Sequence, residues 1–121
     1  MSRRIKAGDG WRIGWCSQDS KYQGLVGAND WAIELTSEEF ADFQRLLNQL
    51  VATMKAMEAE LMESEKISCE AESELVWLEA TGYPYHYTIR LILNGDRRCE
   101  GNWAAEAVPE FIAAINSLEV S

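Results

Sequence analysis

Hydrophobic and polar residues alternate in two short stretches near the start of the chain. Residues 11–16 (WRIGWC) place their large apolar side chains at the odd positions, and residues 30–36 (DWAIELT) do the same with Trp31, Ile33 and Leu35. A period of two is typical of strands with one face on a core. The segment between them is interrupted by glycines. We therefore predict a meander of two or three strands before residue 36.

A long amphipathic helix is predicted after this meander. Its start is marked by a capping box, in which the Thr36 hydroxyl accepts from the backbone N–H of Glu39 and the Glu39 carboxylate accepts from the N–H of Thr36. Apolar residues then recur at spacings of three and four along a helix of about 25 residues. This helix stripe consists of Phe40, Phe43, Leu47, Leu50, Met54, Met57 and Leu61, widened by Leu46 and Val51. Packing on the chain's own sheet is favoured, with self-association as the alternative.

Residues 67–82 (ISCEAESELVWLEATG) return to a strand pattern with one strongly negative face. The polar face holds Ser68, Glu70, Glu72 and Glu74. The apolar face holds Cys69, Ala71, Leu75 and Trp77. We therefore expect a strand with one side in water.

The next segment, GYPYHY at residues 82–87, combines three tyrosines, a proline and the only histidine of the sequence. Gly82, Tyr83 and Pro84 mark a reversal of the chain, and an aromatic residue before proline leaves a cis bond open. After the turn, alternate residues are predicted to face the core. They are Tyr85, Tyr87, Ile89, Leu91 and Leu93. His86 is predicted to lie on the opposite face.

Asn94-Gly95 is the strongest hairpin signal in the chain, because both residues tolerate the positive φ of a type I′ turn. Its partner strand is predicted from about residue 97 to residue 103. Pro109 suits the first turn of a last helix, where its missing N–H breaks no hydrogen bond. The apolar stripe of this helix consists of Phe111, Ile112, Ile115 and Leu118.

The predicted order is strands, helix, strands, helix. DWAIELTSEEFADFQRLL and NWAAEAVPEFIAAINSL form a weak repeat, each with a tryptophan, a short connection and a helix that opens with phenylalanine. This favours an α+β fold of two strand-then-helix units on a shared or paired antiparallel sheet. A chain of 121 residues fits a single domain over residues 1–121.

Composition and charge narrow the possible partners. The formal net charge of -9 repels polyanions and anionic membranes at long range. No stretch approaches the roughly 20 apolar residues of a membrane-spanning helix, and the basic start is not followed by the apolar core of a secretory signal. Cys16, Cys69 and Cys99 have no C-x-x-C spacing, which favours reduced thiols over zinc or disulfides. We expect a cytoplasmic protein without a cofactor or metal.

Aromatic and basic residues are the candidates for a binding site. Stacked bases need aromatic rings together with a positive groove for the phosphates. Basic residues cluster near the start of the chain and beside the last hairpin, and the two groups would form one patch if the first strand lay next to that hairpin. A core role for the tryptophans is the simpler interpretation. The candidate binding residues are Trp11, Arg12, Trp15, Tyr83, His86, Arg90, Arg97 and Arg98.

Catalytic motifs are missing from the sequence. It has no phosphate-binding glycine loop, no H-E-x-x-H and no G-x-S-x-G. Catalysis by His86 with Glu79 would require the two groups to share a pocket. The acidic residues of the segment 58–79 lack the glycine-turned pattern of a calcium loop and are interpreted as a solvated face, or as a docking face for a basic protein. They are Glu58, Glu60, Glu63, Glu65, Glu70, Glu72, Glu74 and Glu79.

At WRIGW, DWAIELTSEEFADF, LVWLEATGYPYHYTIRLILN and EGNWAAEAVPEFIAAI, the chain resembles a cyanobacterial family known as the domain of unknown function number eighteen-eighteen. The resemblance covers nearly the whole length. It implies a fold related to the single-stranded-DNA-binding transcriptional regulators, the group that includes plant Whirly proteins and the positive cofactor four domain. The lysine-rich DNA-contacting motif of Whirly proteins has no counterpart here, so no binding residue is carried across.

We therefore expect a non-enzymatic cytoplasmic binding or interaction domain with protein partners. A single-stranded nucleic-acid-binding or transcription-related protein is the alternative, although the net charge disfavours nucleic acid. A small enzyme is the second alternative. Self-association is possible through the helix stripe Phe40–Leu61, and no membrane contact is expected.

Overall fold

The computed structural model describes residues 4–18, 21–60 and 65–118, which form two four-stranded antiparallel sheets and two helices. The first sheet contains β1 (Arg4–Gly8), β2 (Trp11–Trp15), β3 (Gly24–Gly27) and β4 (Ala32–Leu35). The second sheet contains β5 (Ile67–Glu72), β6 (Val76–Tyr83), β7 (His86–Leu93) and β8 (Glu100–Trp103). Helix α1 (Ser37–Glu58) joins the sheets, and helix α2 (Val108–Ser117) follows β8. The predicted α+β class is confirmed.

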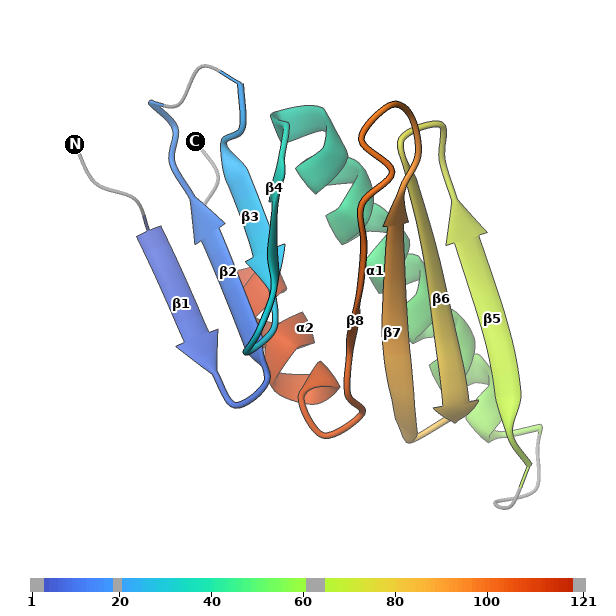
Figure 1. Cartoon of the computed structure of the whole chain (residues 1–121). Helices are drawn as coiled ribbons and strands as arrows, with labels where there is room; N and C mark the ends of the chain where they lie inside the picture. The colour runs from blue at the N-terminus through green and yellow to red at the C-terminus, as the bar shows by residue number, and fades with distance from the viewer. Residues whose placement is uncertain (1–3, 19–20, 61–64, 119–121) are drawn as a thin grey trace.

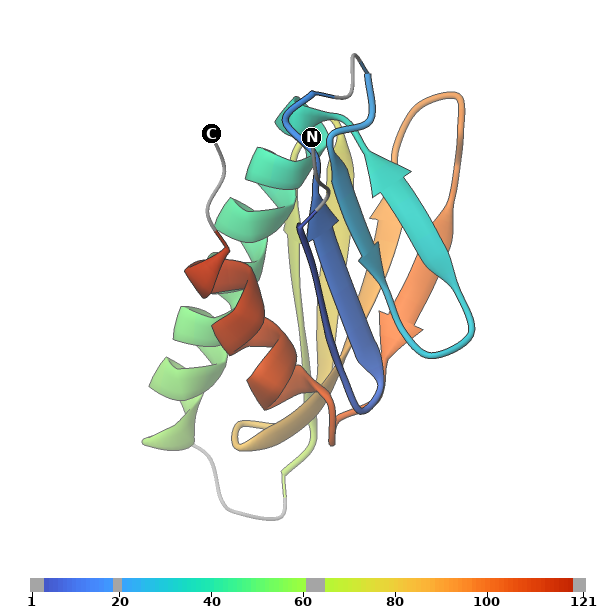
Figure 2. The same ribbon diagram turned by 90° about the vertical axis from the view of Figure 1, so that its left-hand side faces the viewer.

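Both helices lie on the same side of the two sheets (Figure 1, Figure 2). Helix α1 follows the first sheet in the chain but packs mainly on β5 and β6 of the second. Helix α2 follows the second sheet but contacts β1 and β2 of the first, as well as β7. Each helix therefore ties the two units together, and neither described helix covers the opposite, outer faces of the sheets.

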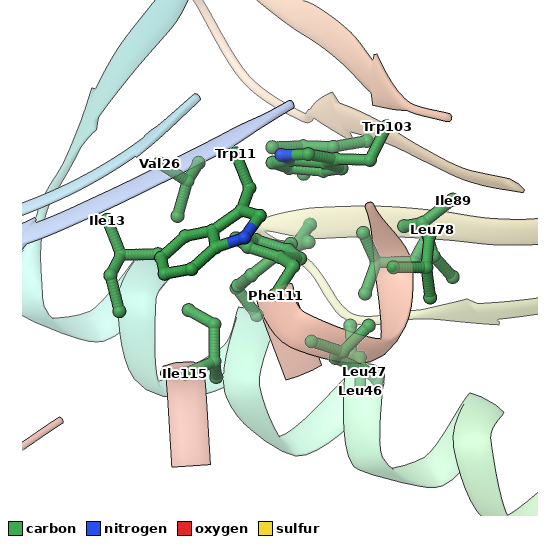
Figure 3. Packing of buried hydrophobic residues seen from close by; sticks show 14 of the residues in the cluster. Trp11, Ile13, Val26, Leu46, Leu47, Leu78, Ile89, Trp103, Phe111 and Ile115 are labelled. Carbon is green, nitrogen blue, oxygen red and sulfur yellow. The ribbon is translucent and has the colours of Figure 1, made fainter. Parts of the chain in front are cut away.

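The core fills the space between the helices and the sheets. Figure 3 shows side chains from β2 (Trp11), β8 (Trp103), α1 (Leu47) and α2 (Phe111) gathered in one cluster. The rings of Trp103 and Phe111 stack with centroids 4.4 Å apart. Burial of each such large side chain stabilises the fold by about 1.5–3 kcal/mol.

Helix α1 confirms the predicted capping box and most of the helix stripe. The Glu39 N–H donates to Thr36 Oγ1 at 3.1 Å, and the Thr36 N–H donates to Glu39 Oε1 at 2.9 Å. Five stripe residues are almost completely buried inside the chain: Phe40, Phe43, Leu47, Leu50 and Met54. The helix has 22 residues. The last predicted stripe residue, Leu61, lies outside the described residues.

The first meander has four strands, and the prediction of two or three was wrong. The missed strand is β1, which pairs with β2 from Arg4↔Trp15 to Gly8↔Trp11. All five of its residues are exposed. The alternation that signals a half-buried strand is therefore absent from its sequence.

Residues 67–82 contain a turn that was not predicted. The Ser73 hydroxyl accepts hydrogen bonds from the backbone N–H groups of Leu75 and Val76, both at 3.1 Å. The chain reverses there, and Val76 and the alternate residues after it face the core. Trp77 consequently lies half-buried on the outer face of the second sheet, so its predicted core position was wrong.

The two turns beside β7 also differ from prediction. Pro84 and Tyr85 form a two-residue connection between β6 and β7, which leaves Tyr85 64% exposed rather than in the core. The Tyr83–Pro84 peptide bond is trans. Tyr87 is half-buried, and the three apolar residues predicted to follow it on the core face are buried.

Asn94 and Gly95 do not form a two-residue hairpin, and β8 begins at Glu100 rather than near residue 97. The Asn94 N–H donates to the Leu75 carbonyl at 2.9 Å, and its side-chain amide donates to the Ser73 carbonyl at 3.2 Å. These bonds hold Asn94 on the β5–β6 turn. A longer loop over residues 94–99 is the result.

Pro109 lies in the first turn of α2, as predicted, and Phe111 and Ile115 are completely buried. The three cysteines are free thiols. No helix among the described residues combines the length and the apolar character needed to cross a membrane.

Candidate functional site

Two of the predicted binding residues, Trp11 and Trp15, belong to the core. Trp11 is 7% exposed, and its indole N–H donates to Glu110 Oε1 at 3.1 Å. Trp15 is 5% exposed and packs on Phe40 with ring centroids 5.4 Å apart. Neither ring presents a face on which a base could stack. The core interpretation of these two tryptophans is confirmed.

Arg12 acts within the fold. Its Nε donates to the Ala28 carbonyl at 2.8 Å, and its Nη2 donates to the Trp31 carbonyl at 2.9 Å. Both carbonyls belong to the connection between β3 and β4. The guanidinium therefore holds this connection against β2, and its donors are directed at the protein rather than at a ligand.

Arg97 joins the second unit to the first. Its Nη1 donates to the Glu34 carbonyl of β4 at 2.6 Å, and its Nη2 pairs with the carboxylate of Glu39 at the start of α1. The guanidinium also lies 4.7 Å from the centroid of the Tyr22 ring. Glu39 is buried and accepts a second hydrogen bond, from the Thr36 N–H. The loop over residues 94–99 is thereby fixed to the first unit.

Two tryptophans, Trp31 of the first unit and Trp103 of the second, also lie where the two units meet. The Trp103 indole N–H donates to the Gly27 carbonyl at 2.8 Å, and the Trp103 ring lies 5.0 Å from that of Trp31. Gly101 allows this approach, because a Cβ there would lie 2.4 Å from the Trp31 ring. We call this contact between the two units the seam. It consists of Gly27, Trp31, Glu34, Glu39, Arg97, Gly101 and Trp103.

The remaining arginines do not combine with the basic start of the chain. Arg90 lies on the outer face of the second sheet, where its Nη2 pairs with Glu100 at 2.9 Å and its guanidinium covers Trp77 at 5.7 Å. Arg98 is exposed in the loop after β7. The basic strand β1 is at the far edge of the other sheet, separated from β4 by two strands. The predicted single basic patch is therefore not formed.

GYPYHY contributes to a hollow of about 300 Å³ between the two helices and the β6–β7 turn, which we call the groove. Residues 84–87 form one wall. Helix α1 contributes Val51, Lys55 and Glu58, and the region around the start of α2 contributes Ala105, Val108, Pro109 and Ile112. Most of these groups are apolar, and Lys55 and Glu58 add one charge of each sign. The groove is therefore amphipathic.

The β6–β7 turn places Tyr85 beside this groove. Gly82 has φ +143°, and a Cβ there would lie 2.6 Å from the His86 carbonyl oxygen, so a side chain would strain this end of the hairpin. The rings of Tyr83 and Tyr85 stack with centroids 6.1 Å apart. Tyr83, a predicted binding residue, thus supports an exposed ring of the groove without lining it.

His86 and Tyr87 bring titratable groups to the groove. His86 Nε2 lies 3.5 Å from Glu106 Oε2, and both side chains are exposed. Burial raises the pKa of the Tyr87 phenol. Glu79 lines a separate hollow with Thr88, Arg90 and Asn102, so the shared pocket that catalysis by His86 and Glu79 would need is not present.

The described residues contain no group of three or more histidine, cysteine, aspartate or glutamate side chains placed to hold a metal ion. The acidic residues at 58, 60, 65, 70, 72 and 74 are exposed, and Glu79 is half-buried. Glu63 lies outside the described residues. What the groove offers chemically is contact with apolar side chains and a few polar groups to orient them.

Sequence reasoning found part of this site and missed the rest. The aromatic cluster of GYPYHY was a visible signal, and it identified His86 and the turn. The sequence pattern predicts core positions for Val51 and Ile112, yet both are half-buried and line the groove. No local signal separates a groove-lining position from a core position on an amphipathic helix.

Comparison with known proteins identifies the family. A sequence model described as domain of unknown function DUF1818 matches residues 6–118. The chain belongs to this DUF1818 family. No curated protein matches the sequence.

A solved structure is similar to this DUF1818 chain over its whole length. It is the crystal structure of a protein of unknown function from Prochlorococcus sp. NATL2A, described as a member of the DUF155 family. The two sequences are 29% identical, with 97% of this chain and 98% of that chain covered and a TM-score of 0.88. The comparisons establish the family and the fold and leave the function unknown.

Proposed function

We propose that this protein is a non-enzymatic binding domain that captures a segment of another protein in the groove. The observation that carries the proposal is the position of Tyr85, whose ring is 64% exposed beside other apolar groups of the groove. Such a ring supplies a large contact area at low cost in conformational entropy. A partner's apolar side chain would remove both surfaces from water.

The walls of the groove are suited to a polypeptide. Val51 and Ile112 come from different helices and provide aliphatic contact, while Lys55 and Glu58 offer one charge of each sign. A protein segment carries apolar and charged groups in the same combination. The volume of about 300 Å³ accommodates a few side chains rather than a folded domain.

Nucleic-acid binding is the second candidate function. The observation that favours it is the Trp77 ring on the outer face of the second sheet, with the Arg90 guanidinium 5.7 Å away. Three carboxylates oppose it, because Glu70 accepts from the Trp77 indole N–H, Glu79 lines the adjoining hollow and Glu100 pairs with Arg90. We rank it below protein binding because this surface offers phosphates too little positive charge.

We also propose that the fold is related to the Whirly-like regulators. Support comes from the two strand-then-helix units and from the contact of their helices, where Asn48 and Asn116 exchange two hydrogen bonds of 2.9 Å. A shared fold would leave the function open.

The groove proposal is tested by affinity purification from the source cells with three forms of the chain. The wild type is compared with Val51→Glu, which puts a charge into the groove, and with Arg90→Glu, which changes the outer face of the second sheet. Proteins bound by the wild type and by Arg90→Glu, and reduced about tenfold by Val51→Glu, would support the proposal. Denaturant unfolding verifies that all three forms are folded.

Two results would contradict the proposal that the groove binds a protein segment. One is a set of bound proteins that Val51→Glu leaves unchanged, since that binding would not use the groove. The other is the recovery of nucleic acid that is lost with Arg90→Glu. Its logarithmic affinity would fall linearly with the logarithm of the salt concentration, with a slope of about 0.7 per phosphate contacted, and this would establish the second candidate.

A further inference from the structure

Strand β1 is an open edge of the first sheet. Among the described residues it pairs with β2 alone, and all five of its residues are exposed. In an antiparallel ladder, alternate residues direct their N–H and C=O groups away from the partner strand. About half of the backbone polar groups of β1 therefore face outwards, which is the geometry on which an added strand forms.

The other described edge strands are less suited to receive a strand. The edge strands β4 and β8 both lie at the seam. There Arg97 donates a hydrogen bond to the Glu34 carbonyl of β4. Strand β5 is at the far edge of the second sheet and exposes Ser68, Glu70 and Glu72 on one face. Among the edges that the structure describes, β1 alone has every residue exposed.

The two faces of β1 have different chemistry. Arg4 and Lys6 are paired with core-facing residues of β2, so their side chains leave the strand on the side of α2, where Lys6 Nζ bonds to Ser117 Oγ at 3.2 Å. A hollow of about 290 Å³ is lined there by Arg4, Lys6, Ser117 and Leu118. Ile5 is on the opposite face and is 57% exposed.

We propose that β1 binds, by strand addition, an extended protein segment that carries acidic side chains at alternate positions and aliphatic ones between them. The acidic side chains enter the hollow beside Arg4 and Lys6, and the aliphatic ones cover Ile5. Charge complementarity selects this occupant, because β1 presents two cations on a chain of net charge -9. This surface is separate from the groove and does not depend on the function proposed for it.

A second copy of the chain is a poorer occupant. Two β1 strands pairing with each other would place the cations of one copy near those of the other, and like charges across a ladder are destabilising. Strand β5 of a second copy whose helices lay on the same side of the joined sheet would place its carboxylates on the outer face, whereas Arg4 and Lys6 lie on the helix side. An acidic segment from another protein avoids both conflicts.

The test uses a capped peptide of about seven alternating glutamate and valine residues, the length of an ordinary strand. Isotope-labelled protein is titrated with it, and the amide signals of the full chain are followed. We expect shifts concentrated on residues 4–8 and absent from residues 67–72. Lys6→Glu should weaken binding about fivefold, while Glu70→Lys, on the other edge strand, should change it little.

Three control peptides make the result decisive. A lysine–valine peptide should bind about tenfold more weakly. Two further glutamate–valine peptides carry methyl groups on the backbone nitrogens, one at the glutamates and one at the valines. Because alternate N–H groups point to opposite edges of a strand, each peptide keeps its side chains but cannot donate hydrogen bonds from one of its two edges. Strand addition predicts that one of them loses about tenfold in affinity.

Several outcomes would overturn the proposal. They are the absence of shifts on residues 4–8, equal binding of the lysine peptide, equal binding of both methylated peptides, and β1 shifts that follow protein concentration without peptide. The last result would identify a second copy as the occupant, and sedimentation would then show the dimer.

Discussion

The seam and the groove use similar residue types in opposite ways. At the seam, Arg97 and Trp103 are directed at partners within the chain: the guanidinium pairs with Glu39, and the indole N–H donates to the Gly27 carbonyl. At the groove, Tyr85 is 64% exposed and Lys55 is exposed. Aromatic and basic residues therefore indicate a binding surface only where a large part of the side chain stays exposed to solvent.

This contrast separates stability from binding. A buried polar group that loses its partner retains the full cost of its desolvation, so changes at the seam should lower the free energy of unfolding. An exposed ring loses little on unfolding, so changes at Tyr85 should leave that free energy nearly unchanged.

Trp103→Ala is expected to have the largest effect. Trp103 is 1% exposed and contacts aromatic rings of both helices and Trp31, so truncation leaves a large cavity in the core. We expect the free energy of unfolding in urea to fall by about 4 kcal/mol. Trp77→Ala is the matched control and should cost much less, because Trp77 is half-buried on an outer face. Equal losses would contradict the assignment of Trp103 to the seam.

Arg97→Ala should come next. It leaves Glu39 buried without its cationic partner, and we expect a loss of about 2 kcal/mol in the free energy of unfolding. Arg90→Ala also removes an ion pair, but an exposed one, and should cost about 0.5 kcal/mol or less. If the two arginine variants unfolded at the same urea concentration, the seam would have no special role in joining the units.

A smaller change in the free energy of unfolding is expected at high pH, where Tyr87 ionises. Burial raises the pKa of Tyr87 above its ordinary value of 10.0, so the phenol ionises more easily in the unfolded chain. Its contribution to stability is complete below pH 10.0 and is lost as the pH rises through the folded-state pKa. Tyr87→Phe should make the free energy of unfolding less dependent on pH in this range. An unchanged dependence would show that Tyr87 is not responsible.

The smallest effect on stability is expected for Tyr85→Ser. The substitution removes the most exposed ring of the groove and the stacking partner of Tyr83. We expect the free energy of unfolding to change by about 0.5 kcal/mol or less, and partner binding by the groove to be lost. A loss of stability comparable with that of Arg97→Ala would mean that the turn is part of the core.

Features of the fold that depend on local chemistry were predicted from the sequence. The capping box at Thr36 and the apolar stripe of α1 require only residues within a few turns of each other. Trp77 was misplaced because a hydroxyl, that of Ser73, ends a strand whose apolar pattern continues beyond it. Strand β1 was missed because an exposed edge strand has no core-facing pattern to detect.

The candidate site depends on contacts between distant residues. Arg97 was predicted as a ligand contact, but it pairs with Glu39, which is far away in the chain. No sequence pattern near Arg97 indicates this pairing. The groove brings together α1, the β6–β7 turn and α2. Since each helix packs on the sheet of the other unit, their relative positions follow from the complete topology rather than from any local pattern.

Site-specific photo-cross-linking in living cells tests most directly whether the groove is the binding surface. Benzoylphenylalanine is placed at position 85 in the groove or at position 77 on the outer face of the second sheet, and the adducts are identified by mass spectrometry. We expect discrete protein adducts from position 85 that disappear when Val51→Glu is added. Adducts from position 77 alone, or adducts from position 85 that persist with Val51→Glu, would contradict it.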